Sequence, residues 1–153
     1  MTSVAQTAAK QATDRPGMAL SEYLRRSFQG ERFEIIDGSI IPMTATVSGH
    51  IRLIKRLFLL LNAFVEASHL GEVFSEMTYT IKPPDDPNWV TGSLTPDVAF
   101  VSTAQLAAHP ATPETQSQPF TLVPDLAVEV MSPNDTYTKA LGKAARYFED
   151  GVR

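Results

Sequence analysis

Two acidic residues interrupt apolar runs that otherwise have the pattern of buried strands. Asp97 lies in the run at residues 94–101, and Glu129 lies in the run at residues 126–133. Short runs that are apolar on both faces are typical of strands covered on both sides. Two carboxylates on neighbouring buried strands repel each other unless a cation lies between them. A hard divalent ion such as Mg²⁺, which prefers oxygen ligands, would satisfy both.

The same two acids also allow a purely structural interpretation. Asp97 follows a proline and could cap the turn at the start of its strand. Glu129 could pair with a lysine or an arginine. From the residue types alone, both interpretations stay open.

Three further residues could complete such a site. Glu34 lies in a β-rich run that is apolar on both faces, so it is either at an exposed strand edge or a third acid of the site. His50 falls at the start of a long amphipathic helix, where it could equally be a cap or a surface residue. Lys143 lies on the last helix, and its ammonium group either faces solvent or lies near the carboxylates.

Apolar periodicity predicts the elements that must position these residues. We expect a short helix near residues 21–26, a hairpin with an Asp-Gly turn at 33–43 and a helix over 50–68. A strand over 72–81, interrupted near residue 77, and a last helix ending at residue 150 complete the set. We expect the core stripe of the long helix at Ile51, Ile54, Phe58, Leu61 and Val65. The stripe predicted to be buried on the last helix is Tyr137, Leu141, Ala144 and Phe148.

Composition limits the class of protein. With 153 residues the chain suffices for one domain, which we place at residues 18–153 after a tail at 1–17 that we expect to be disordered. The chain has no cysteine, which fits a cytoplasmic location, and its apolar runs are too short to cross a membrane. The formal charge of −4 argues against non-specific coating of nucleic acid, so we expect any contact with DNA to be local and metal-assisted.

In their order along the chain, these residues resemble the Uma-two family, a mostly bacterial, restriction-endonuclease-like family of the PD-(D/E)xK nuclease superfamily. The resemblance covers Met18 to Arg153. It rests on Glu-Tyr-Leu, then Phe-Glu-Ile-Ile-Asp-Gly, then His50, then Pro-Asp-Val-Ala-Phe, then Pro-Asp-Leu-Ala-Val-Glu-Val-Met-Ser-Pro-Asn-Asp, and finally Lys143 and Tyr147. The ordered set is more specific than any one motif in it.

The resemblance implies an α/β (α+β) fold, with a mixed β-sheet flanked by helices and a metal site at one edge. Asp97 is then the central acid, and Glu129 is the acid of the Glu-x-Lys element. The usual lysine position, two residues after Glu129, holds Met131, which makes Lys143 the candidate for that role. Glu34 and His50 are implied as auxiliary site residues.

The implied activity is metal-assisted hydrolysis of phosphodiester bonds in DNA. One or two Mg²⁺ or Mn²⁺ ions would be held by Asp97, Glu129 and the carbonyl group of Val130. A competing hypothesis is a non-catalytic, homodimeric binding or regulatory protein, which Met131 and the acidic surface favour. A nucleotide-processing phosphohydrolase is a third hypothesis, but the chain lacks a G-x-x-x-x-G-K loop. Because family members continue with another strand and hairpin, we expect a domain truncated at its C-terminal end.

Overall fold

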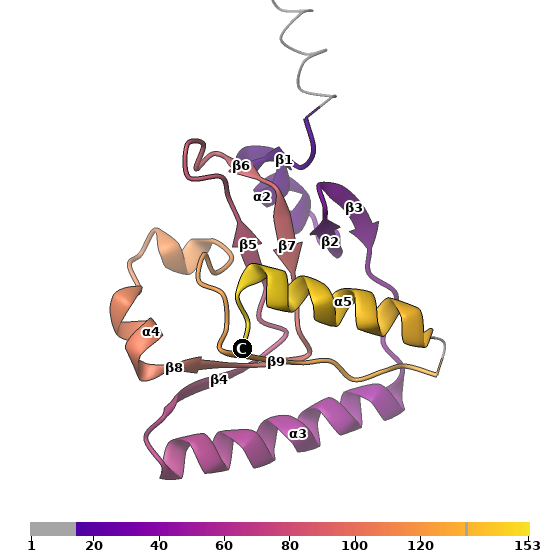
Figure 1. Ribbon diagram of the computed structural model, residues 1–153, viewed down its shortest axis with the longest axis vertical. Coiled ribbons are helices and arrows are strands. Elements are labelled where there is room, and N and C mark those ends of the chain that lie inside the picture. Colours follow the sequence, from indigo (N-terminus) through magenta and orange to yellow (C-terminus); the bar gives the residue numbers. More distant parts are fainter. Residues whose placement is uncertain (1–14, 134) are drawn as a thin grey trace, which may run out of the picture. The chain divides into compact units, whose positions relative to one another are not determined.

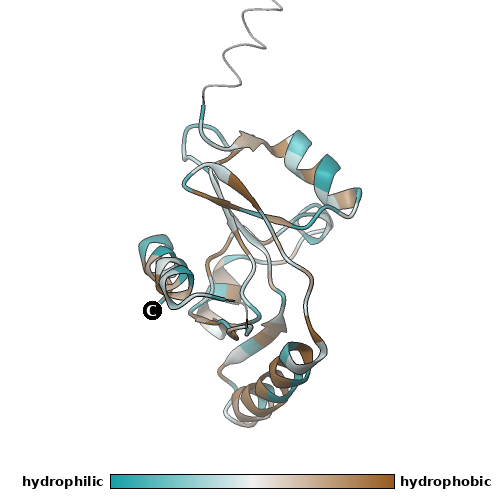
Figure 2. Ribbon diagram, turned by 90° about the vertical axis from the view of Figure 1, so that its right-hand side faces the viewer, coloured by the Kyte–Doolittle hydropathy of each residue, from teal (hydrophilic) through white to brown (hydrophobic). Residues whose placement is uncertain are grey.

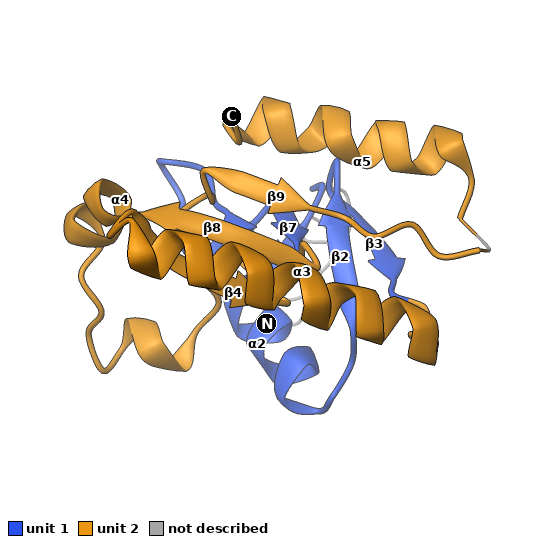
Figure 3. Cartoon of the chain, turned by 90° about the horizontal axis from the view of Figure 1, so that it is seen from below, with its two compact units in different colours: residues 1–43, 80–94 blue, residues 44–79, 95–153 orange. Residues whose placement is uncertain are grey.

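The computed structural model describes residues 15–133 and 135–153 of the chain (Figure 1). These residues divide into two compact units: residues up to 43 with 80–94 form unit 1, and residues 44–79 with 95–153 form unit 2 (Figure 3). The sequence predicted one domain over residues 18–153. That boundary stays a prediction. Among the described residues, one cluster of buried side chains lies in unit 1 and two lie in unit 2.

Unit 1 is built on the predicted hairpin. Strand β2 (Phe33–Ile36) pairs with β3 (Ser39–Pro42) in antiparallel register. The two turn residues, Asp37 and Gly38, have φ of 51° and 74°, as a type I′ turn requires. The remaining elements are β1 (Met18–Ala19), α2 (Leu20–Phe28), β5 (Tyr79–Ile81), β6 (Trp89–Val90) and β7 (Gly92–Leu94). The four-stranded sheet has the order β3-β2-β7-β5, and Tyr79, the first residue of β5, is counted in unit 2. Both the hairpin and the short helix are therefore confirmed.

The chain enters unit 1 through contacts made by Arg15 and the residues after it. The Arg15 guanidinium lies 4.5 Å from the centre of the Trp89 ring and 2.6 Å from a carboxylate oxygen of Asp86. The backbone carbonyl of Pro16 accepts a hydrogen bond from the Trp89 indole, at 2.9 Å. The last residues of the predicted tail are thus part of the fold, while residues 1–14 lie outside the described part of the chain.

Unit 2 contains a three-stranded antiparallel sheet in the order β4-β8-β9. Its strands are β4 (Gly71–Ser75), β8 (Val98–Ser102) and β9 (Leu126–Val128). Helix α3 (Ser48–Ala67) packs on this sheet, and α5 (Tyr137–Asp150) runs on the side of β9 (Figures 1 and 3). The other elements of unit 2 are α4 (Thr103–Ala108) and the 3₁₀ helix η1 (Thr115–Ser117).

The two acid-bearing runs are neighbours, as predicted, but their strands are shorter than expected. The run at 94–101 splits into the end of β7 and the start of β8, because Pro96 has no N–H for a ladder and Asp97 turns its carboxylate to another backbone group. The second strand ends at Val128, and Glu129 follows it. The predicted interruption near residue 77 is confirmed between β4 and β5.

Helix α5 is turned opposite to the prediction. Tyr137, Leu141 and Phe148 are exposed, and Phe148 keeps 68% of its surface in solvent, whereas its neighbour Tyr147 keeps 5%. The hydropathy colouring shows apolar residues along both long helices of unit 2 (Figure 2), and several of them are exposed. The polar face of α5 is turned inward because it has partners there: Glu129 pairs with Lys143 and accepts a hydrogen bond from Tyr147, and the Tyr79 hydroxyl donates a hydrogen bond to Asp150.

The stripe predicted for α3 is confirmed apart from its first member. Val65 is buried, and Ile54, Phe58 and Leu61 pack against the same cluster. Ile51 is exposed, because the first turns of the helix extend past that cluster. Neither α3 nor any other helix of the described residues is long and apolar enough to cross a membrane.

Candidate active site on unit 2

The register of β8 and β9 places the two acids at the same end of the sheet. Val98 pairs with Val128, and Phe100 pairs with Leu126, in an antiparallel ladder. Continuing this register by one residue sets Asp97 opposite Glu129, just beyond the last ladder pair. One acid from each strand therefore lies just past the end of the sheet, where the two strands are no longer joined by ladder hydrogen bonds.

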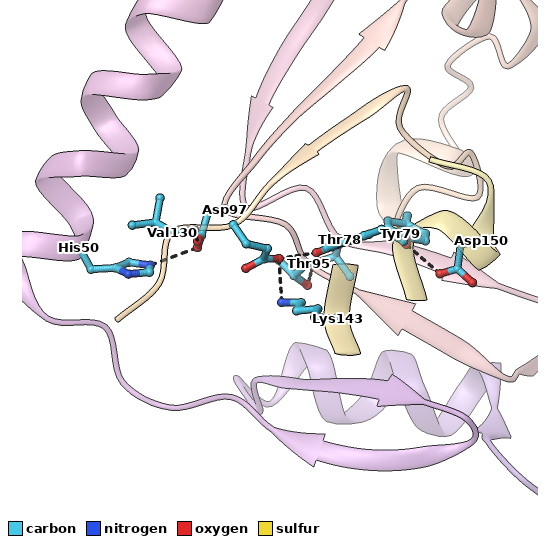
Figure 4. Close-up of polar contacts among 10 residues, drawn as sticks. His50, Thr78, Tyr79, Thr95, Asp97, Val130, Lys143 and Asp150 are labelled. Carbon is cyan, nitrogen blue, oxygen red and sulfur yellow. Dashed lines mark hydrogen bonds and ion pairs between the residues drawn. The ribbon is translucent and has the colours of Figure 1, made fainter. Parts of the chain in front are cut away.

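Asp97 is held by its neighbours through both carboxylate oxygens. Oδ2 accepts the backbone N–H of Val130 at 2.7 Å, and Oδ1 lies 3.2 Å from Nε2 of His50 (Figure 4). His50 is in the first turn of α3, and 10% of its side chain is exposed. Its Nδ1 atom is buried and has no hydrogen-bond partner among the residues that the structure describes. The imidazole thus carries one nitrogen directed at the acid and one unused nitrogen.

Glu129 is held from α5. Lys143 and Tyr147 lie one helical turn apart on the same face of that helix, and both reach the same oxygen. The Lys143 ammonium lies 2.8 Å from Oε1 of Glu129, and the Tyr147 hydroxyl donates a hydrogen bond to Oε1 as well. The Lys143 ammonium also lies 5.9 Å from the centre of the Tyr147 ring, within the range of a cation–π contact.

The environment of Glu129 opposes its ionisation. Burial raises the pKa of its carboxyl group, and the nearby Asp97 carboxylate pushes that pKa the same way. The charge and hydrogen bonds of Lys143 and Tyr147 lower it without reversing the shift. A second cation beside the two acids would favour the ionised form of both.

A second polar cluster, made of Tyr79, Asp150 and Arg146, lies next to Tyr147. Tyr79, which is fully buried on β5, has its ring centre 6.4 Å from that of Tyr147 and donates a hydrogen bond to Asp150 at 2.8 Å. Asp150 also pairs with Nε of Arg146 at 2.9 Å. Burial raises the pKa of Asp150, while the hydroxyl of Tyr79 and the guanidinium of Arg146 lower it.

The candidate residues therefore fall into two sets. Unit 2 brings together Asp97, Glu129, His50 and Lys143, together with the backbone N–H of Val130. Glu34 lies in unit 1, on the central strand β2, and its side chain is buried. The alternative that placed Glu34 at an exposed strand edge is thus wrong. Its role as a third acid stays a prediction.

The residues present fit a hard divalent ion with few protein ligands. Within residues 15–133 and 135–153, no group of three or more histidine and acidic side chains is arranged to hold a metal ion. Mg²⁺ commonly binds through only one or two carboxylates, with water and phosphate oxygens completing its octahedron. Asp97 and Glu129 supply two carboxylates, and each oxygen of an ionised carboxylate has two lone pairs. These residues therefore suit Mg²⁺ or Mn²⁺, which keep water ligands, and do not suit a metal ion whose ligands are all side chains.

Sequence patterns gave Tyr147 no role of its own, and they missed Tyr79 and Asp150. The signal for Tyr147 was its spacing of four residues from Lys143, which places the two side chains on one helical face. Tyr79 and Asp150 meet across a sequence separation of 71 residues, and no local pattern reports such a contact.

Comparison with solved structures defines the fold class of this arrangement. A protein from Anabaena variabilis ATCC 29413, described as a "putative nuclease belonging to DUF820", has a structure similar to this chain, with a TM-score of 0.66 and 20% sequence identity. The match covers 88% of this chain and 70% of the other. The predicted restriction-endonuclease-like fold, a mixed α/β structure, is thereby confirmed.

The sequence itself identifies the family. The model of the Uma2 family, described as "Putative restriction endonuclease", matches residues 20–153. This chain belongs to the Uma2 (Uma-two) family, as its ordered motifs predicted. A comparison with curated proteins found no match.

Proposed function

We propose that this chain is a metal-dependent endonuclease that hydrolyses phosphodiester bonds in DNA. The observation that supports this most directly is the meeting of Asp97 and Glu129 at one end of the β8–β9 pair, with the Lys143 ammonium 2.8 Å from one of them. Paired carboxylates with an adjacent ammonium suit an anionic substrate that arrives with a divalent ion. The family description, "Putative restriction endonuclease", and the similar solved structure, described as a "putative nuclease", support the same reaction class.

Each residue has a role that follows from its position. Asp97 and Glu129, with the Val130 carbonyl group, would hold one or two Mg²⁺ or Mn²⁺ ions. Such an ion lowers the pKa of a bound water and neutralises phosphoryl oxygens. Lys143 would stabilise the charge that develops on the phosphate during in-line attack.

His50 would keep Asp97 in place. Its Nε2 atom lies 3.2 Å from Oδ1 of the Asp97 carboxylate, so the imidazole would fix the direction of that ligand.

The test is cleavage of supercoiled plasmid DNA by the purified protein in Mg²⁺ or Mn²⁺. We expect nicked and linear products, and we expect EDTA to abolish them. Glu129→Gln should be inactive because a ligand is lost. Lys143→Ala should be slow but still metal-binding, because its role is at the transition state. Lys139→Ala, an exposed residue one turn earlier on α5, is the matched control and should cleave at the parent rate.

A second measurement separates binding of metal from turnover. Mg²⁺ should raise the melting temperature of the parent, and Asp97→Asn should abolish that increase. The alternative function is a non-catalytic binding or regulatory protein, which the exposed Met131 at the usual lysine position favours. A parent protein that binds Mn²⁺ yet leaves supercoiled, linear and single-stranded DNA intact would establish that alternative and reject the nuclease.

A further inference from the structure

Two donors converge on a single oxygen of Glu129. Lys143 and Tyr147 both reach Oε1, and among the described residues neither contact uses Oε2. A carboxylate fixed through one oxygen presents the other in a defined direction, which is what a metal ligand requires. The pairing therefore leaves Oε2 for a metal ion or a water molecule.

The two donors differ in how firmly they are held. The Tyr147 ring is 5% exposed, packs against the buried Tyr79 ring, and belongs to the last turn of α5, where its carbonyl accepts the N–H of Val152 at 2.9 Å. Lys143 has a flexible four-carbon side chain with three rotatable donors. A tyrosine hydroxyl on a packed ring has far fewer conformations available than a lysine ammonium.

The proposed role of Lys143 makes this difference consequential. At the transition state its ammonium would also interact with the phosphate, and a flexible donor shared in this way holds Oε1 less firmly. Were Lys143 the sole donor to Oε1, the Glu129 carboxylate would be free to rotate at that moment.

We propose that Tyr147 is the positioning residue of the site: its hydroxyl holds Oε1 of Glu129, so that Oε2 stays directed as a metal ligand while Lys143 moves between Glu129 and the substrate. This inference rests on the proposed metal-dependent function. It assigns Tyr147 no contact with the substrate. The cation–π contact between Lys143 and the Tyr147 ring keeps the ammonium close to the carboxylate between turnovers.

The test compares Tyr147→Phe with a matched variant, Tyr79→Phe. Each change removes one hydroxyl group from a buried ring, and the two rings lie 6.4 Å apart. The Tyr79 hydroxyl is bonded to Asp150 and not to Glu129. A purely structural role would therefore affect both variants alike, whereas a positioning role would distinguish them.

The main readout is the affinity for Mn²⁺, measured by isothermal titration calorimetry on the full chain. We expect Tyr147→Phe to weaken it by roughly 10- to 100-fold, as is typical when the hydrogen-bond partner of a ligand is removed, and Tyr79→Phe to stay within about twofold of the parent. Lys143→Ala should keep its Mn²⁺ affinity, because the tyrosine alone still holds Oε1. On DNA, Tyr147→Phe should lower kcat and leave KM near the parent value.

The possible failures are distinguishable. Equal Mn²⁺ affinity of Tyr147→Phe and the parent would overturn the role of Tyr147 and leave the nuclease proposal standing. A larger loss in Lys143→Ala than in Tyr147→Phe would show that the lysine is the positioning group. A parent that binds no Mn²⁺ would reject both proposals. Melting of each variant without metal shows whether it is folded, and Tyr147→Phe keeps every ring contact of the parent.

Discussion

Replacing two adjacent aromatic residues of α5 by alanine tests which face of the helix is buried. Periodicity predicts that Phe148 is buried, whereas the structure leaves it 68% exposed and buries Tyr147 instead, at 5%. Full burial of such a side chain stabilises by about 1.5–3 kcal/mol. Phe148, with about a third of its surface covered, should lose about 0.5–1 kcal/mol of unfolding free energy on truncation.

Tyr147→Ala should cost much more. It removes a buried ring, leaves a cavity against Tyr79 and deprives Glu129 of a donor, and changes of this kind cost about 3–5 kcal/mol. Both variants gain the same small helix preference from alanine, so that term cancels in the comparison.

Urea unfolding, followed by circular dichroism, measures the difference between the two variants. We expect Tyr147→Ala to be less stable than Phe148→Ala by at least about 2 kcal/mol, or about 4–8 °C in melting temperature for a chain of this size. The opposite order would mean that α5 is turned as the periodicity predicted. The assignment of Lys143 and Tyr147 to Glu129 would then be wrong as well.

Two further predictions test local structure. Burial raises the pKa of Asp125, but hydrogen bonds from Ser102, including its backbone N–H at 2.8 Å, outweigh burial and hold that pKa below its usual value. The carboxylate then contributes stability above the unfolded pKa of about 4 and loses it as pH falls through the folded pKa, so Asp125→Ala should be less stable at pH 7 and should approach the parent below about pH 4. A gap that does not change with pH would contradict this. Gly71→Ala should destabilise by more than about 1 kcal/mol, because its φ is +153° and a Cβ there would lie 2.0 Å from the Val101 carbonyl oxygen. Gly142 lies in the interior of α5, and a Cβ there would meet no other atom within 4 Å, so Gly142→Ala should instead stabilise by about 0.5–1 kcal/mol. Equal effects of the two changes in a thermal melt would contradict the geometry.

The pairing of the acid-bearing strands was predictable because its signal is local. Asp97 and Glu129 each stand out as one charge in an apolar run, and antiparallel pairing of those runs needs only their hydrophobic patterns to match. The hairpin of β2 and β3 was predictable for a similar reason, since Asp37 and Gly38 tolerate the positive φ of its turn.

The facing of α5 was not predictable from its pattern. A period of 3.6 residues shows which side chains share a face, but it does not show which face is turned inward. The helix has two coherent faces, one containing Tyr137, Leu141 and Phe148, the other containing Lys143 and Tyr147. The choice depends on partners that are distant in the sequence.

Polar contacts therefore offset the loss of apolar burial on this helix. Leaving Leu141 and Phe148 exposed forgoes the gain from burying them, about 1.5–3 kcal/mol for each side chain if it were complete. Turning the face with Lys143 and Tyr147 outward would leave the partly buried Glu129 carboxylate without its donors. Asp150 would then also lose its hydrogen bond from Tyr79. Uncompensated buried charges cost about 3–5 kcal/mol when a partner is removed. The carboxylate of Glu129 thus both needs α5 and orients it, so the residues that would carry the chemistry also place the helix that supplies Lys143.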